Sequence, residues 1–231
     1  MIRRMPSSVL HQLHKRLIVS CQPTPGGSMD SVHSVLGFAG SALAGGAAGL
    51  RIEGVDRVRA VKTAYSEPVI GLIKRDLADS PVRITPLLDD VEALALAGAD
   101  IIAVDCTDRT RPATVRELIA CIRSHGRLAM ADCATLAQAQ AALAMGADVV
   151  GSTLSGYTGG PVPHPPDLDL VRALRTLKSF VIAEGRLNTP ELAAQAARAG
   201  ADAVVVGSAI TRPDVVTSWF AQATMGAYAE C

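Results

Sequence analysis

The chain has 231 residues, of which 49% are hydrophobic and 19% charged, and its 22 basic residues balance its 22 acidic ones. A chain of this size can bury the core of a single α/β barrel, and its zero net charge creates no field that would attract nucleic acid or an anionic membrane. Only 3% of residues are aromatic, so few side chains can stack on single-stranded bases.

The chain starts with the segment 1–16, MIRRMPSSVLHQLHKR, which predicts an amphipathic helix and lacks the continuous apolar core of a secretion signal. Nowhere do 18 residues run apolar without charge, so we expect no membrane span. The cysteines are odd in number and show no C-x-x-C spacing, which favours a reducing, cytoplasmic location. They are Cys21, Cys106, Cys121, Cys133 and Cys231.

Eight short runs rich in Val, Ile and Leu follow along the chain. None alternates cleanly between apolar and polar residues, which is typical of strands buried on both faces. The runs are residues 16–20, 49–53, 69–73, 101–105, 127–131, 149–153, 180–184 and 203–207. The segments between them are rich in alanine and leucine with charges at helical spacing, which predicts amphipathic helices. Three of them lead into the next strand through similar motifs: LAGAD, MGADVV and RAGADAVVVG. In each, glycine predicts a left-handed helix cap directly before a strand.

Eight strands with seven intervening helices predict a (β/α)₈ TIM barrel, formed by residues 1–231 as a single domain with an N-terminal helix. A doubly wound open sheet is the alternative. Such a sheet usually has fewer strands and often carries G-x-G-x-x-G after the first, where this chain has SCQPTPGGS.

The carboxyl ends of barrel strands build the active site, and here those ends are unusually polar. A charge buried there without a partner would cost several kcal/mol, so the charges either pair, lean into solvent or serve a ligand. The polar strand ends carry, in chain order, Gln22, Arg51, Glu53, Lys74, Arg75, Asp76, Asp105, Asp132, Ser152, Thr153, Glu184, Arg186 and Ser208.

A phosphate site is predicted at the last two strand ends, where barrels commonly hold this group. Gly185 and Gly207 allow the backbone to approach an anion, and a helix start follows each of them. Ser208 offers a hydroxyl, while Arg186 and Arg212 can add charge-assisted hydrogen bonds. The barrel is therefore expected to be of the phosphate-binding type.

Proton transfer is the chemistry that the remaining strand ends favour. Lys74, Glu184, Asp105 and Asp132 offer a base, an acid and groups that orient hydroxyls. A partly desolvated lysine beside Arg51 or Arg75 would have a lowered pKa, although it can equally form a Schiff base. No histidine ends a predicted strand, so neither a metal site nor an activated cysteine is expected.

Long motifs in matching order make the sequence resemble the N-acetylmannosamine-6-phosphate 2-epimerases of bacterial amino-sugar and sialic acid catabolism. They are LIVSCQP (17–23), RIEGV (51–55), GLIKRDLADSPVRITP (71–86), ALAGADIIAVDCTDRTRP (95–112), STLSGYT (152–158), VIAEGRLNTPE (181–191) and VGSAITRP (206–213). The chain departs from the family at Cys106, where glycine is frequent, and in the Pro- and Gly-rich loop 158–166.

The resemblance implies an isomerase that interconverts N-acetylmannosamine 6-phosphate and N-acetylglucosamine 6-phosphate without a cofactor, in a homodimer. It places the catalytic residues at Lys74, which would move the C2 proton, and Glu184, which would assist ring opening. It places substrate contacts at Gln22, Arg51, Asp132 and Arg212. Two alternatives remain: another phosphate-binding barrel, such as a pentose-phosphate epimerase or Schiff-base aldolase, and a non-catalytic sugar-phosphate sensor.

Overall fold

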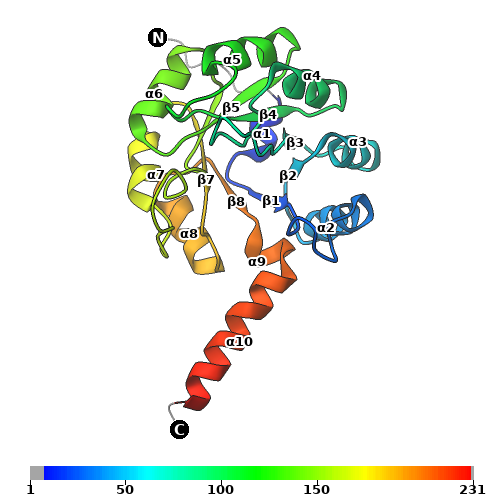
Figure 1. The fold of residues 1–231 in the computed structure, drawn as a ribbon, viewed down its shortest axis with the longest axis vertical. Helices are drawn as coiled ribbons and strands as arrows, with labels where there is room; N and C mark the ends of the chain where they lie inside the picture. The colour runs from blue at the N-terminus through cyan, green and yellow to red at the C-terminus, as the bar shows by residue number, and fades with distance from the viewer. Residues whose placement is uncertain (1–7, 230–231) are drawn as a thin grey trace.

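The predicted barrel is present in the computed structural model, which describes residues 8–229. Eight parallel strands close in sequence order, with the last beside the first (Figure 1). The strands are β1 (Leu17–Cys21), β2 (Gly49–Glu53), β3 (Val69–Leu72), β4 (Ile101–Asp105), β5 (Leu128–Asp132), β6 (Val149–Gly151), β7 (Phe180–Glu184) and β8 (Ala203–Val206). The TIM-barrel prediction is confirmed, and the open sheet is excluded.

Seven helices follow the first seven strands and ring the barrel (Figure 1). They are α2 (Val32–Ala44), α3 (Val55–Ala64), α4 (Leu88–Leu96), α5 (Val115–Ser124), α6 (Leu136–Ala144), α7 (Leu168–Arg175) and α8 (Pro190–Arg198). The glycines of the three predicted caps have positive φ: 96° at Gly98, 103° at Gly146 and 108° at Gly200. Within residues 8–229, no helix is long and apolar enough to cross a membrane.

The first helix, α1 (Ser8–Leu13), is the described part of the predicted N-terminal helix. Its Leu10 and Leu13 are buried among side chains of the barrel interior, including Ile18 and Ile70. The helix therefore adds apolar cover to the interior core. The rest of that prediction, residues 1–7, and Cys231 lie outside the described residues.

Strand alternation decides which residues enter the barrel. In β4, Ile101 and Ala103 belong to the interior cluster, whereas Ile102 and Val104 belong to the cluster beneath the helices. Asp105 continues the interior series, because side chains two apart share a face. The same two-residue step leads from interior residues to Asp132 in β5, Glu184 in β7 and, beyond the end of β3, Lys74.

The chain after β8 leaves the ring of helices. A short helix, α9 (Ser208–Thr211), is tied to the first strand by the Thr211 hydroxyl, which donates to the Ser20 carbonyl at 2.7 Å. The last helix, α10 (Pro213–Ala229), then extends away from the barrel (Figure 1), and none of its residues is buried.

Candidate active site

A cavity of about 610 Å³ opens at the carboxyl ends of the strands. Its charged lining is mostly basic, which suits an anionic ligand. The basic residues are Arg51, Lys74, Arg83, Arg109, Arg186 and Arg212, and the acidic ones are Asp105 and Glu184. Nine of the ten predicted site residues line this cavity, and the exception is Asp132. The nine are Gln22, Arg51, Lys74, Glu184, Gly185, Arg186, Gly207, Ser208 and Arg212.

The floor of the cavity is a buried ion cluster around Arg51, whose side chain is 1% exposed. Its guanidinium donates to both carboxylate oxygens of Asp132, at 2.6 and 3.2 Å, and lies 3.0 Å from Glu184 Oε2. Two carboxylates thus share one cation, and this pairing offsets part of their desolvation. Asp132 is fully buried in this cluster and does not line the cavity, unlike the other predicted substrate contacts.

Lys74 lies two residues beyond β3 and reaches the cavity with its side chain half-buried. Its backbone N–H donates to Glu53 Oε1 at 3.3 Å, and within residues 8–229 its amino group has no hydrogen-bond partner. Burial, together with the neighbouring cations Arg212 and Arg51, lowers the pKa of Lys74 to about 8. A substantial fraction of the amine is therefore neutral near physiological pH and can accept a proton.

Glu184 is perturbed in the opposite direction. Burial raises the pKa of its carboxyl to about 7, and the Arg51 guanidinium opposes this effect. Lys74 also acts on this carboxyl, and each group influences the ionisation of the other. A base and an acid that both titrate near neutrality thus line one cavity, an arrangement found at proton-transfer sites.

Three residues predicted to bind phosphate, Gly185, Gly207 and Ser208, lie directly after β7 and β8. Gly185 has φ of 114°, a conformation that L side chains rarely adopt, and Gly207 caps α9, in which Ser208 is the first residue. Arg212, at the end of α9, donates from Nε to the Gln22 carbonyl at 2.8 Å. Its side chain therefore spans from the eighth strand end to the first.

Arg186 is held by the loop that follows β6. It donates to the carbonyls of Pro165, at 2.8 Å, and Ser155, and its guanidinium lies 5.4 Å from the ring centroid of Tyr157. These contacts occupy part of its donor set. Arg186 lines the cavity but is also the anchor of this loop.

Comparisons with known proteins decide the family. The NanE family model, whose description is "Putative N-acetylmannosamine-6-phosphate epimerase", matches residues 35–226. The chain is 54% identical over 215 residues to the "Putative N-acetylmannosamine-6-phosphate 2-epimerase" of Actinobacillus pleuropneumoniae, covering 93% of this chain and 94% of that one. The chain belongs to the NanE family.

Two further comparisons differ in how much of the matched protein the chain covers. The "Bifunctional enzyme NanE/NanK" of Brucella melitensis is 58% identical over 227 residues, covering 98% of this chain and 44% of that protein. The chain therefore spans less than half the length of that relative. The solved structure of the N-acetylmannosamine-6-phosphate 2-epimerase from Clostridium perfringens has a TM-score of 0.90 and 38% identity, covering 96% of this chain and 99% of that one.

The NanE site also contains basic residues that sequence reasoning did not select. Arg83 and Arg109 line the cavity on the side of β3 and β4. Arg109 binds Asp105 at 2.6 Å, and Arg111 binds the same carboxylate at 3.1 Å. Two arginines on one aspartate leave a net positive charge, and the only sequence signal for this was the charge-rich motif DCTDRTRP.

Proposed function

We propose that this chain interconverts N-acetylmannosamine 6-phosphate and N-acetylglucosamine 6-phosphate, as an isomerase of amino-sugar and sialic acid catabolism. The observation that carries the proposal is the Lys74 amine, half-buried in a basic cavity with its pKa lowered to about 8. Membership of the NanE family supports the sugar phosphate as the substrate. The mostly basic lining of the cavity supports the binding of one anionic ligand. We take residues 1–231 to act as a single domain.

The proton is moved at C2 of the open-chain sugar. This carbon lies next to the C1 aldehyde, so the neutral Lys74 amine takes the C2 proton and the electron pair passes to the aldehyde oxygen as an enolate. Arg51, which lines the floor of the cavity, stabilises the developing negative charge. The Lys74 ammonium then returns a proton to the other face of C2, and the aldehyde is restored. The step needs no redox cofactor, because no electron leaves the sugar.

Ring opening needs a second proton carrier. The ring oxygen must gain a proton and the C1 hydroxyl must lose one, and Glu184 is placed to carry it because its pKa of about 7 leaves both forms populated. Gly185, Gly207, Ser208 and Arg212 hold the phosphate, with Arg186 as a further donor. Gln22, whose buried Oε1 has no hydrogen-bond partner within residues 8–229, accepts a hydrogen bond from the sugar.

Asp132 is assigned an indirect role. Asp132 is fully buried, bonds to the Arg51 guanidinium and does not line the cavity, which supports a role through Arg51 in place of the predicted direct contact. Asp132 therefore serves the substrate by orienting Arg51. Exchange of Asp132 for asparagine is expected to lower turnover more than it weakens substrate binding.

Deuterium exchange tests the proposed reaction. Purified protein is incubated with N-acetylmannosamine 6-phosphate in D₂O, and NMR follows the C2 proton signal and the appearance of the epimer. We expect deuterium at C2 in both sugars with the parent protein and none with Lys74→Ala. Lys178→Gln, an exposed lysine just before β7, is the matched control and should behave like the parent.

Each outcome of that assay has a meaning. Near-normal exchange by Lys74→Ala would remove Lys74 from the reaction. Failure of the parent protein to exchange C2 would refute the epimerase, and borohydride trapping of sugar on Lys74 would instead indicate a Schiff-base aldolase. Ligand binding without any exchange would indicate a sensor.

We also propose a homodimer, with α10 as the contact. Its exposed side chains include Phe220 (71%), Met225 (72%) and Tyr228 (78%), and no residue of the helix is buried. The helix follows the eighth strand but extends away from the ring, so it does not cover its own barrel (Figure 1). A second copy supplies an apolar surface for it, which removes these side chains from water. The free cysteines Cys21, Cys106, Cys121 and Cys133 support a cytoplasmic location.

A further inference from the structure

Thr85 lies in a backbone conformation that few threonines adopt. Its φ is 45°, in the left-handed region, where a β-branched residue is an outlier. Pro86 follows it, and a residue before proline is normally extended. A conformation of this kind persists only where the surrounding structure holds it. Thr85 is fully buried in the segment that joins β3 to α4, so its own contacts must supply that hold.

The contacts of Thr85 fall on Ile73, the residue before Lys74. The Thr85 N–H donates to the Ile73 carbonyl at 2.7 Å, and the Thr85 hydroxyl accepts the Ile73 N–H at 3.2 Å. The hydroxyl takes the place of the backbone carbonyl that accepts this bond in a regular antiparallel pair. Both backbone polar groups of Ile73 are thus bonded to one residue, and this fixes the backbone from which Lys74 leaves.

The residue before Thr85 continues this hold on Lys74. Ile84 forms an isolated antiparallel bridge with Lys74, and its carbonyl accepts the Asp105 N–H at 3.1 Å, which ties the segment to the end of β4. The Lys74 N–H itself donates to Glu53 Oε1 at 3.3 Å. Because the Lys74 amino group has no hydrogen-bond partner within residues 8–229, its position in the cavity depends on this backbone.

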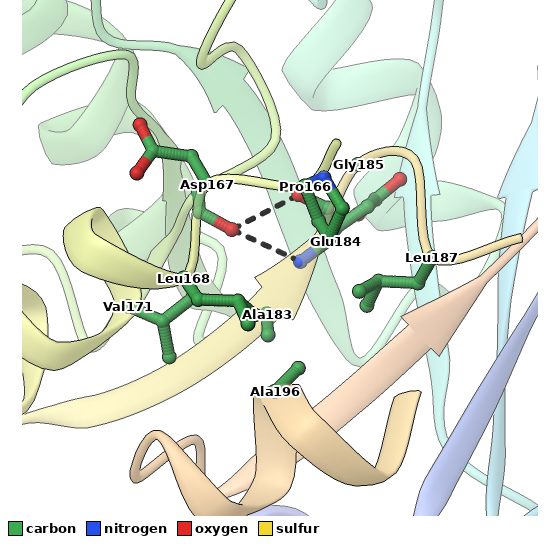
Figure 2. A pocket seen from close by; sticks show the side chains of 10 residues that line it. Pro166, Asp167, Leu168, Val171, Ala183, Glu184, Gly185, Leu187 and Ala196 are labelled. Carbon is green, nitrogen blue, oxygen red and sulfur yellow. Dashed lines mark hydrogen bonds between the residues drawn. The ribbon is translucent and has the colours of Figure 1, made fainter. Parts of the chain in front are cut away.

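The acid of the proposed reaction is held in a similar way. The Ser152 hydroxyl donates to the Glu184 carbonyl at 2.9 Å and accepts from the Glu184 N–H at 3.1 Å, and these two bonds are the dashed lines in Figure 2. In both places one buried hydroxyl residue satisfies both backbone groups of a residue at a strand end. The base and the acid are therefore each fixed through the backbone by a neighbouring segment.

We propose that Thr85 is a positioning residue of this site, whose hydroxyl and N–H hold the Ile73 backbone so that the Lys74 amine is directed at C2 of the sugar. The role rests on the proposed epimerase function and adds to it the group that aims the base. It also accounts for the left-handed φ, because that conformation is the one in which both groups of Thr85 meet Ile73.

The surroundings of the Lys74 amine decide how its pKa responds if this hold is lost. Burial is the largest influence on that pKa and lowers it. The charged groups that act on it are Arg212 and Arg51, which also lower the pKa, and Glu53 and Glu184, which raise it. If the backbone before Lys74 loosens, the amine can move towards solvent and regain hydration. Its pKa should then rise towards the ordinary lysine value.

The test compares Thr85→Val, which leaves the Ile73 N–H without its acceptor, with Thr85→Ser, which keeps both bonds. Protein labelled with ¹³C at lysine Cε is titrated by NMR without substrate, and the Lys74→Gln spectrum identifies the Lys74 signal. In Thr85→Val the Lys74 midpoint should rise by roughly one unit, a partial return to the ordinary value. In Thr85→Ser it should stay at the parent value.

Turnover is measured on the same proteins. Thr85→Val should lower kcat by on the order of 10- to 100-fold, the effect of a misplaced catalytic group. KM should change little, because Thr85 does not line the cavity. Thr63→Val removes an exposed hydroxyl from α3 and is the matched control, which should behave like the parent.

Thr85→Gly separates positioning from backbone strain. Glycine adopts a left-handed φ readily, so this variant relieves the strain while it also lacks the hydroxyl. It should raise the Lys74 midpoint and lower kcat as Thr85→Val does, and it decides the question alone if Thr85→Val does not fold.

The proposal is overturned if the Lys74 midpoint stays at the parent value in the hydroxyl-free variants, or if Thr85→Ser behaves like Thr85→Val. A lower Tm with an unchanged midpoint would assign Thr85 to stability alone. The titration needs no turnover. A parent protein that fails to exchange C2 while the midpoint shifts as expected would therefore refute the epimerase and leave the hold of Thr85 on Lys74 standing.

Discussion

Removing the Arg51 guanidinium tests the ion cluster directly. In Arg51→Met, a side chain of similar length keeps the apolar packing but leaves Asp132, which is fully buried, and Glu184, which is 16% exposed, without their shared cation. Breaking a buried ion pair by removing one partner typically costs about 3–5 kcal/mol. Here one cation serves two carboxylates, so we expect a loss at the upper end of that range in the free energy of unfolding.

The assay is equilibrium unfolding in urea together with thermal melting. For a chain of this length the expected loss corresponds to a drop of roughly 10 to 20 °C in Tm. Arg59→Met is the matched control, because Arg59 pairs with Asp56 on an exposed helix surface. Exposed pairs of that kind contribute about 0.2–0.5 kcal/mol, so this control should unfold almost like the parent.

A double variant separates charge from packing. Arg51→Met combined with Asp132→Asn should be more stable than Arg51→Met alone, because one uncompensated charge has been removed. The reasoning would be refuted if Arg51→Met lost no more stability than Arg59→Met, or if the second change made the protein still less stable.

Further predictions concern pH, phosphate and assembly. The pH profile of kcat/KM for epimerisation should be bell-shaped, with midpoints near the two pKa values of about 7 and about 8. At low pH Lys74 is protonated and cannot take the C2 proton. At high pH Glu184 has lost the proton that it must supply. A monotonic profile across this range would contradict the assignment. Arg212→Gln should raise KM for the phosphorylated sugar about 10-fold or more through the lost charge-assisted bond. It should also move the limb near pH 8 to higher pH, because Arg212 lowers the pKa of Lys74. Exchange of Phe220 and Tyr228 for glutamate should convert a dimer into monomers, measured by sedimentation, whereas a parent protein that is already monomeric would refute the α10 contact.

Much of the fold was predictable because barrel strands and helices have separate local signals. Runs rich in Val, Ile and Leu located all eight strands, and the repeated glycine caps marked where helices end. The strand ends were less certain: residues 149–153 were predicted as one strand, but β6 ends at Gly151. Beyond that point the Ser152 side chain bonds to the backbone of Glu184, an interaction that sequence spacing cannot indicate.

The sequence allowed us to predict which residues lie together at the site. Parity along each strand places Lys74, Asp105 and Glu184 at one mouth, and the structure confirms that they line one cavity. How deeply each of these side chains is buried was not predictable, because burial depends on ion pairs between strands that are far apart in the sequence. Asp132 was predicted to contact the substrate; in the structure it is fully buried, bonds to Arg51 and does not line the cavity. The direction of α10 was not predictable either, because its apolar residues do not specify which surface they cover.

The join between the first and last strands has a consequence for how the protein is made. β1 pairs with β8, Thr211 binds the Ser20 carbonyl, and Arg212 binds the Gln22 carbonyl, so the candidate site lies astride this join. Until residues near 206 leave the ribosome, β1 and β7 are open edges that can pair with other chains. A sugar phosphate that contacts both Gln22 and Arg212 would link the ends of β1 and β8 and so stabilise the closed barrel against unfolding.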